Sequence, residues 1–293
     1  MRITPLSQQK GKMKNARFII HIAILMIFVS ANYVAADTRE EMIAKYIKLS
    51  GAENALASLP VQLEALSFQN ITTSKKPQTD RKAIELLKQA FDSEQARKEL
   101  FQFISMKMDE SLLQNLLVWY ESPLGQKVVS EESSSSGADK QAKILRYLAS
   151  MQDNPPAFDR ITLIQNVEST TQLSELTTNI IIKIMKGMLK SINLSLPKEK
   201  QVEDVNIEKY ISNERPLIKE ESRKQMILSL YYTFRNFTND EIKQYIAFYK
   251  TKAGQEEIEI TGGAFFHVLN EWVAVATDKI VAYVKSESEK SKE

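Results

Sequence analysis

Residues 237–255, FTNDEIKQYIAFYKTKAGQ, decide the fold, because residues 108–126, MDESLLQNLLVWYESPLGQ, form a degenerate copy of them 129 positions earlier. The two stretches align without a gap. They are identical at only three pairs of positions, which are Tyr120 and Tyr249, Gly125 and Gly254, and Gln126 and Gln255. Their likeness therefore depends on the physical role of each position rather than on identity.

Each stretch opens with the signals of a helix N-terminus. Thr238 can cap a helix, with Glu241 three residues later to complete a capping box, and Phe237 can pack on Ile242 as a hydrophobic staple. The earlier stretch repeats the cap and the staple through Asp109, Met108 and Leu113, and it lacks the box because Leu112 stands in place of the glutamate. Both stretches therefore predict a helix that starts directly after the cap.

Apolar residues then recur at steps of three and four positions, which indicates one buried face of a helix. These residues are Leu113, Leu116, Leu117 and Tyr120 in the first copy and Ile242, Tyr245, Ile246 and Tyr249 in the second. A hydroxyl residue follows at Ser122 and at Thr251. Ser122 before Pro123 is typical of an N-cap followed by the first helical residue, so a second helix starts at once.

Gly125 and Gly254 lie one turn into that second helix. A missing side chain permits close approach of another backbone, or of the ring at Trp119 or Phe248. Each copy is therefore predicted to be a tight helix corner, with Gly125, Gln126, Gly254 and Gln255 as its structural motif.

The aromatic pair Phe248-Tyr249, the four-residue gap and the pair Gly254-Gln255 resemble the bacterial family known as domain of unknown function 2059. The likeness covers residues 108–126 and 237–255 and is strongest in the second stretch. Proteins of this family are exported, helical and of no established activity. The resemblance thus implies a helical fold and export, and it supplies no catalytic residues.

The N-terminal segment has the layout of a secretory signal peptide. A basic leader ends at Arg17, an apolar run covers residues 18–29, and Val34 and Ala36 are the small residues before a cut. The apolar run is shorter than the roughly 20 residues that span a bilayer. Cleavage after Ala36 is favoured over a retained anchor, and the chain is predicted to be periplasmic or secreted. Met13 is an alternative start.

Composition excludes several functions. The chain has no cysteine, so it has no disulfide, thiol nucleophile or cysteine-bound metal. Five of its 39 basic residues lie in residues 1–36, which leaves 34 against 37 acidic residues in the remainder. This balance argues against nucleic-acid binding.

Beyond the signal peptide, no segment shows the alternation of a strand bounded by turns, so the predicted fold class is all-α. Asn154-Pro155-Pro156 breaks the helical pattern and gives the domains 37–153 and 154–285, two related helical-bundle halves from an internal duplication, followed by a polar tail at 286–293. A loop is expected at residues 72–77, and residues 133–136, four serines, fit a loop or a small-residue helix equally. Helices are expected at 40–49, 52–67 with Pro60 as a kink or break, from about 79 and 92 onward, 140–153, 157–192, 214–234 and beyond 263.

No arrangement of residues predicts catalysis, and the sequence predicts no metal site and no cofactor. It lacks a zinc-binding histidine pair, a Gly-x-Ser-x-Gly elbow, a phosphate-binding glycine loop and calcium-loop spacing. Glu256-Glu257 and Asp139-Lys140 are expected to be ordinary charges on helix surfaces. The candidate binding residues are Trp119, Tyr120, Phe248, Tyr249 and His267, each weighed against a purely structural role in the core.

The favoured function is that of a non-catalytic exported envelope protein that binds a partner protein or peptide in a groove between helices. The alternative is an apolar small molecule or lipid bound in the bundle interior, and a third, weaker hypothesis is an enzyme that acts through carboxylates. Lys183, Lys186 and Lys190 lie on one side of a helical segment at 180–192, so peripheral membrane contact is a further alternative to an ordinary solvated face.

Overall fold

The computed structural model describes residues 37–71, 77–134, 140–196 and 198–290. In these residues it contains α-helices, two short 3-10 helices and no strand, so the all-α prediction is confirmed. The predicted signal peptide, residues 1–36, lies outside the described residues. Residues Glu40–Glu293 form one structural unit.

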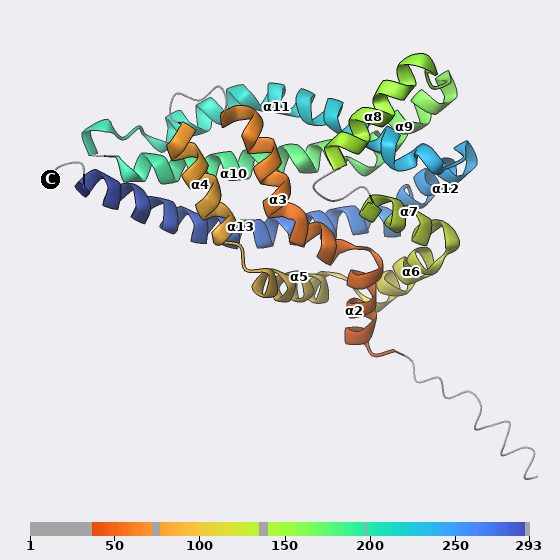
Figure 1. Cartoon of the computed structure of the whole chain (residues 1–293). Helices are drawn as coiled ribbons and strands as arrows, with labels where there is room; N and C mark the ends of the chain where they lie inside the picture. The colour runs from red at the N-terminus through yellow and green to blue at the C-terminus, as the bar shows by residue number, and fades with distance from the viewer. Residues whose placement is uncertain (1–36, 72–76, 135–139, 197, 291–293) are drawn as a thin grey trace, which may run out of the picture. The chain divides into compact units, whose positions relative to one another are not determined.

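The helices follow one another along the chain in a simple order (Figure 1). They are α2 (Arg39–Leu49), α3 (Ala52–Ile71), α4 (Pro77–Gln89), α5 (Ser93–Lys107), α6 (Glu110–Glu121), α7 (Pro123–Ser134), α8 (Lys140–Asp153), α9 (Phe158–Thr171), α10 (Leu173–Ser195), η1 (Lys198–Lys200), α11 (Asp204–Thr233), η2 (Phe234–Asn236), α12 (Asn239–Tyr249) and α13 (Lys252–Lys290). The prolines predicted to break the chain, Pro155 and Pro156, lie between α8 and α9.

Several helix boundaries differ from those expected. The long helix at 157–192 is interrupted at Gln172, whose left-handed φ of 53° ends α9 and begins α10. The helix expected from position 214 begins ten residues earlier and continues past Pro216. Likewise α3 continues past Pro60, and α13 runs without interruption through the predicted start of the polar tail to Lys290. Of the four serines, Ser133 and Ser134 belong to α7, and the other two lie outside the described residues.

Two apolar cores hold the helices together. The first joins α2, α3, α4, α5 and α6 to α13 and one residue of α10, and the second joins α7, α9, α11 and α12. Between the long helices, α10 lies against both α11 and α13 (Figure 1). Trp119 of α6 packs against both cores and so connects them. Each predicted half of the sequence therefore contributes helices to both cores.

The two corners begin as the sequence predicts. The Thr238 hydroxyl accepts a hydrogen bond from the Glu241 amide at 3.2 Å, while the Glu241 carboxylate accepts one from the Thr238 amide at 2.7 Å. In the first corner Asp109 caps α6 by accepting from the Leu112 amide at 2.8 Å. The four staple residues, Met108, Leu113, Phe237 and Ile242, are all buried.

The turns in the two corners are closed by the same hydrogen bonds. The hydroxyl of Ser122 accepts from the Gly125 amide at 3.0 Å, and the hydroxyl of Thr251 accepts from the Gly254 amide at 3.1 Å. Each hydroxyl also donates to the carbonyl three residues earlier, at Trp119 (2.6 Å) and Phe248 (2.7 Å). Both second helices therefore begin at once, as predicted.

The two glycines are required because the second helix crosses the backbone of the first. A Cβ at Gly254 would lie 2.5 Å from the Phe248 carbonyl oxygen and 2.6 Å from Tyr249 Cα. A Cβ at Gly125 would lie closer still to the Trp119 carbonyl oxygen. Of the two alternatives that the sequence left open, the close approach is therefore to backbone and not to a ring.

We predict that Gly125→Ala and Gly254→Ala each lower the free energy of unfolding by about 1–3 kcal/mol, because the new methyl group meets backbone that cannot move aside. Gly262→Ala is the matched control. Its Cβ would meet only the flexible Leu176 Cδ1 at 3.7 Å, so the gain in helix propensity should raise stability by about 0.5–1 kcal/mol. Urea unfolding followed by circular dichroism measures both effects, and equal effects at positions 125 and 262 would contradict the corner geometry.

Candidate functional site

The aromatic residues at equivalent positions of the two corners contact each other directly. The rings of Trp119 and Phe248 stack with centroids 4.2 Å apart and planes within 5° of parallel. The hydroxyls of Tyr120 and Tyr249 lie 3.4 Å apart. Each of these residues thus touches the residue 129 positions away from it, and the structure brings four of the five candidate residues into one cluster.

His267 is the candidate that lies elsewhere. It is half-buried on α13, where its ring centroid lies 5.7 Å from that of Phe103 on α5. The structure therefore places His267 in a packing contact between two helices and not beside the corner aromatics.

Glu257 occupies the centre of the cluster, which corrects the expectation that it is a surface charge. Only 4% of its surface is exposed. The Tyr120 hydroxyl donates to Glu257 Oε1 at 2.5 Å, and the Tyr46 hydroxyl donates to the same oxygen at 2.9 Å. The expectation was wrong because α13 turns this position toward α2 and α6 rather than toward solvent.

Helices α2, α6, α12 and α13 meet at this carboxyl group. Tyr46 of α2 is fully buried, and its ring meets the Tyr120 ring edge-on with centroids 5.8 Å apart. Its hydroxyl also lies 3.0 Å from Thr261 Oγ1 on α13. We refer to Tyr46, Tyr120, Tyr249, Glu257 and Thr261 as the carboxyl–phenol cluster.

Burial controls the electrostatics of the cluster. Burial raises the pKa of Glu257 from 4.5 to about 7, and interactions with Tyr120, Tyr46 and Tyr249 oppose that rise. Glu257 Oε2 is buried and has no hydrogen-bond partner within 3.5 Å among the described residues. Burial, followed by the charge of Glu257, holds the pKa values of Tyr46, Tyr120 and Tyr249 well above 10, so these phenols remain protonated donors at neutral pH.

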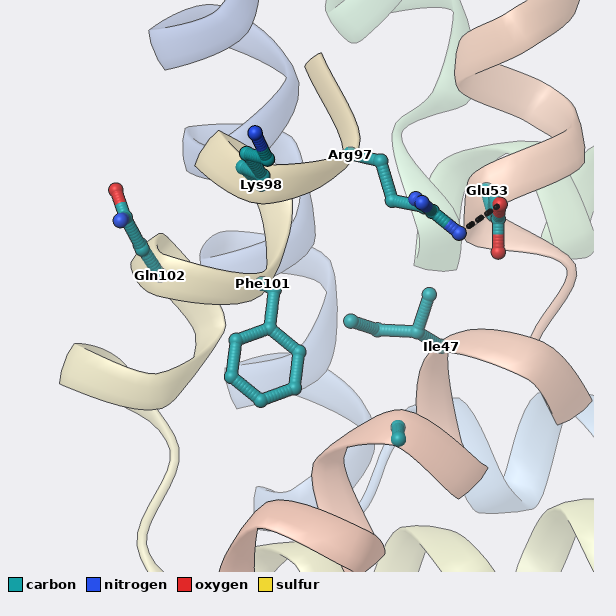
Figure 2. Close-up of a pocket in the computed structure, with 7 residues that line it drawn as sticks. Ile47, Glu53, Arg97, Lys98, Phe101 and Gln102 are labelled. Atoms are coloured by element: carbon teal, nitrogen blue, oxygen red, sulfur yellow. Dashed lines mark ion pairs between the residues drawn. The ribbon is translucent and has the colours of Figure 1, made fainter. Parts of the chain in front are cut away.

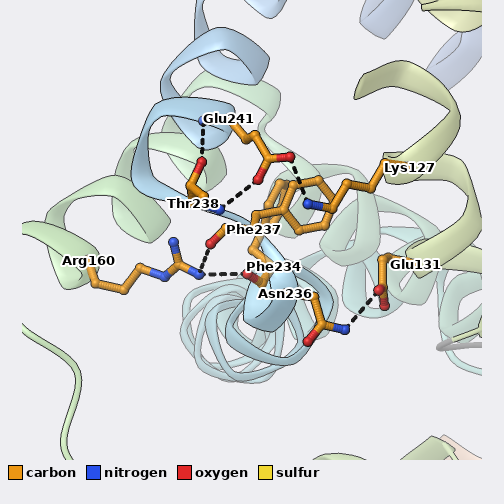
Figure 3. Close-up of polar contacts among 8 residues, drawn as sticks. All are labelled: Lys127, Glu131, Arg160, Phe234, Asn236, Phe237, Thr238 and Glu241. Carbon is orange, nitrogen blue, oxygen red and sulfur yellow. Dashed lines mark hydrogen bonds and ion pairs between the residues drawn. The ribbon is translucent and has the colours of Figure 1, made fainter. Parts of the chain in front are cut away.

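Polar contacts from α7 and α9 fix the turn that leads into the second corner (Figure 3). The Arg160 guanidinium donates to the backbone carbonyls of Phe234 at 2.6 Å and Phe237 at 2.8 Å. Lys127 of α7 forms an ion pair with Glu241 at 2.7 Å, with its ammonium 4.4 Å from the centre of the Phe237 ring. The N-terminus of α12 is therefore held from two neighbouring helices.

An open groove of about 360 Å³ lies between α2 and α5 (Figure 2). Its apolar part is formed by Ile47 and Phe101, which point toward one another from the two helices. An ion pair of 3.8 Å between Arg97 and Glu53 lies beside them. The other lining residues are Ala44, Lys98 and Gln102. The groove thus combines an apolar floor with a mainly basic rim.

In the part of the chain that the structure describes, no group of three or more histidine and acidic side chains is placed to hold a metal ion. Nor is any helix among these residues long and apolar enough to cross a membrane.

The chain is thus a helical-bundle protein whose two corners enclose a buried carboxyl–phenol cluster. Residues 94–153 match the family model described as "Uncharacterized protein conserved in bacteria (DUF2059)". This match confirms the resemblance and covers α5 to α8, including the first corner. The later stretch at 237–255, where the resemblance was expected to be strongest, lies outside the matched residues. Searches of curated proteins and of solved structures found no match.

Sequence reasoning missed Glu257 and the residue that binds it from α2, Tyr46. The sequence does contain a signal for Glu257. Ala253, Ile260 and Ala264 lie at helical steps on one apolar face, and position 257 falls on the same face, so burial of its side chain could have been predicted. The groove left no comparable signal, since its walls come from separate helices and its charged residues resemble ordinary surface residues.

We predict that Glu257→Gln removes a pH dependence of stability. Because the pKa of Glu257 is raised in the folded state, its contribution is complete below pH 4.5 and is lost as pH rises to about 7. The loss amounts to about 3 kcal/mol for a shift of this size. The variant should match the native protein near pH 4.5 and be more stable at pH 8.

Urea unfolding at a series of pH values measures this difference. Glu259→Gln is the matched control, since Glu259 is exposed on the same helix and the same substitution there should leave the pH profile unchanged. A Glu257→Gln profile that runs parallel to the native one would rule out the titration of Glu257.

Proposed function

We propose that the protein is an exported, non-catalytic binding protein whose groove between α2 and α5 accepts a peptide segment of a partner protein. The observation that carries this proposal is the groove itself, with Ile47 and Phe101 facing each other across an open depression. Its volume of about 360 Å³ lies within the range of ligand sites, roughly 300–1,000 Å³. An open groove of this size suits one or two residues of an extended chain.

The charges at the groove define the partner's chemistry. Arg97 is shared between Glu94 at 2.7 Å and Glu53 at 3.8 Å, whereas Lys98 has no ionic partner among the described residues. A peptide segment with an apolar residue next to an acidic one would place the apolar side chain on Phe101 and the carboxylate near Lys98. Electrostatic complementarity of this kind makes binding more specific for one partner and increases the rate of association.

The N-terminal segment supports export to the periplasm. Its basic leader, its short apolar run and the small residues Val34 and Ala36 are those of a cleaved signal peptide. Cleavage after Ala36 leaves α2, which begins at Arg39, close to the new N-terminus. One wall of the groove then lies near the beginning of the mature chain.

We propose further that the two corners derive from an internal duplication. In symmetric pairs, residues close to a two-fold axis contact their own counterparts. Trp119 and Phe248 form such a pair, and so do Tyr120 and Tyr249. Val128 and Glu257, which occupy equivalent positions, each contact the opposite corner. Val128 packs in the core that contains α12, and Glu257 bonds to Tyr120 of α6.

The alternative, an apolar small molecule or lipid in the bundle interior, has weaker support. The sequence suggests it through its content of aromatic residues and methionine, but the corner aromatics stack and hydrogen-bond with one another. Direct contacts of this kind serve packing rather than the lining of a ligand site.

We predict that short peptides selected from a displayed random library on the full protein carry an apolar residue next to aspartate or glutamate. Phe101→Ala removes part of the apolar floor and Lys98→Glu reverses the charge of the rim, so each should weaken binding of a selected peptide at least tenfold, or about 1.4 kcal/mol. Fluorescence anisotropy of the labelled peptide measures the change.

Matched controls lie on the same helix. Met106 and Lys107 are exposed on α5 outside the groove, so Met106→Ala and Lys107→Glu should leave peptide binding unchanged. Selected peptides without acidic residues, or equal losses in the control variants, would contradict binding in the groove.

We predict that the protein recovered from the periplasm of a Gram-negative host begins at Asp37. Ala36→Lys should prevent this cleavage, because the processing site requires a small residue at that position. Thr38→Lys, beyond the cut, is the control and should be processed. N-terminal sequencing and intact mass give the result, and a periplasmic chain that retains residues 1–36 would be inconsistent with a signal peptide.

A further inference from the structure

Tyr46 links the carboxyl–phenol cluster to the groove. It lies on α2 and donates to Glu257 Oε1 at 2.9 Å. Two residues before and one residue after it, Ala44 and Ile47 line the groove. The helix that forms one wall of the groove is therefore the helix that is bonded to Glu257.

The groups that face Glu257 are phenols and a hydroxyl, with formal charges at the edge of the cluster. Tyr46, Tyr120, Tyr245, Tyr249 and Thr261 come from α2, α6, α12 and α13. Burial is the main cause that raises the pKa values of Tyr245 and Tyr249, and Glu132 of α7 adds to it. Lys45, next to Tyr46 in the chain, pairs with Glu121 at 2.5 Å. Burial and three tyrosines are the causes that act on the pKa of Glu257, and none of them supplies a positive charge.

We propose that Glu257 is a proton-operated latch on α2: the neutral carboxyl group holds the helix docked, and the carboxylate makes it open more often. The role of the latch in partner binding rests on the function proposed above, whereas the latch itself does not. The geometry that supports it is a buried carboxyl group with one oxygen bonded to α2 and α6 and the other, Oε2, without a partner among the described residues.

The physical reason lies in the cost of a buried charge. A carboxylate at this position strengthens its bonds to Tyr46 and Tyr120, but its charge stays buried and its Oε2 has no hydrogen-bond partner among the described residues. Opening of α2 removes the Tyr46 ring and admits water to that oxygen. The open state therefore gains stability relative to the docked state once Glu257 is ionised.

The latch changes how often α2 opens, and α2 remains docked in most molecules at every pH. Four residues of α2 are buried, which are Met42, Ile43, Tyr46 and Ile47. Burial of these large side chains favours the docked state, and together they outweigh the effect of one ionisation. A segment clamped between α2 and α5 would accordingly leave faster at neutral pH than at acid pH.

Native-state hydrogen exchange of the full protein tests the latch without any peptide. Once corrected for intrinsic exchange rates, the opening constant of the α2 amides should rise about tenfold per pH unit between pH 4.5 and 7, or about 300-fold in total, and then level off. The sign follows from the raised pKa, since the docked state keeps the proton in this window and the open state has lost it.

Three variants make the result specific. Glu257→Gln should abolish the pH dependence, and Glu259→Gln should preserve it. Tyr46→Phe removes one donor that lowers the pKa of Glu257, so the rise of the α2 opening constant should continue to higher pH. This variant keeps the test valid if Glu257→Gln does not fold.

An opening constant of α2 that is independent of pH, or one that keeps its pH dependence in Glu257→Gln, would overturn the latch. The latch would also be overturned if the α2 amides had the same opening free energy as the amides of α12, because α2 would then open only by global unfolding. Failure of the peptide experiments together with the expected exchange profile would refute the groove's function and leave the latch in place.

Discussion

Crossing of backbone over backbone at Gly125 and Gly254 is the constraint on which the rest of the structure depends. Each glycine lets the second helix of a corner start on top of the first, with no room for a Cβ. This crossing sets the direction in which α7 and α13 leave their corners. Because α13 provides one side of the first core along its length, an error in that direction at Gly254 would displace the packing of α4, α5 and α6.

The two corners meet through side chains that these crossings place. Trp119 stacks on Phe248, and Trp119 also packs against both cores, so the stack lies where the cores adjoin. Just past Gly254, α13 brings Glu257 under the rings of Tyr46 and Tyr120. The buried position of the carboxyl group and the connection between the cores thus both involve the local geometry that occurs in each corner.

The sequence predicted features whose cause is local. The capping box of Thr238 and Glu241 and the turn at Ser122 depend only on residues a few positions apart, and both are present. Features with a distant cause could not be predicted. The helix break at Gln172 adopts a left-handed conformation without a glycine, the residue that would predict it from sequence. The burial of Glu257 depends on Tyr46, which lies 211 positions earlier.

The equivalent position in the first corner indicates what Glu257 is for. Val128 occupies it, is 4% exposed and packs in the second core, so the corner geometry accepts an apolar side chain there. A buried carboxyl group with an unpartnered oxygen stabilises a fold less than an apolar residue that fits the same space. An apolar side chain therefore fits this position of a corner, whereas the raised pKa of Glu257 predicts a stability of the first core that falls as pH rises from 4.5 to about 7. A buried acid that bonds to Tyr46 of α2 is the feature on which the proposed control of that helix rests.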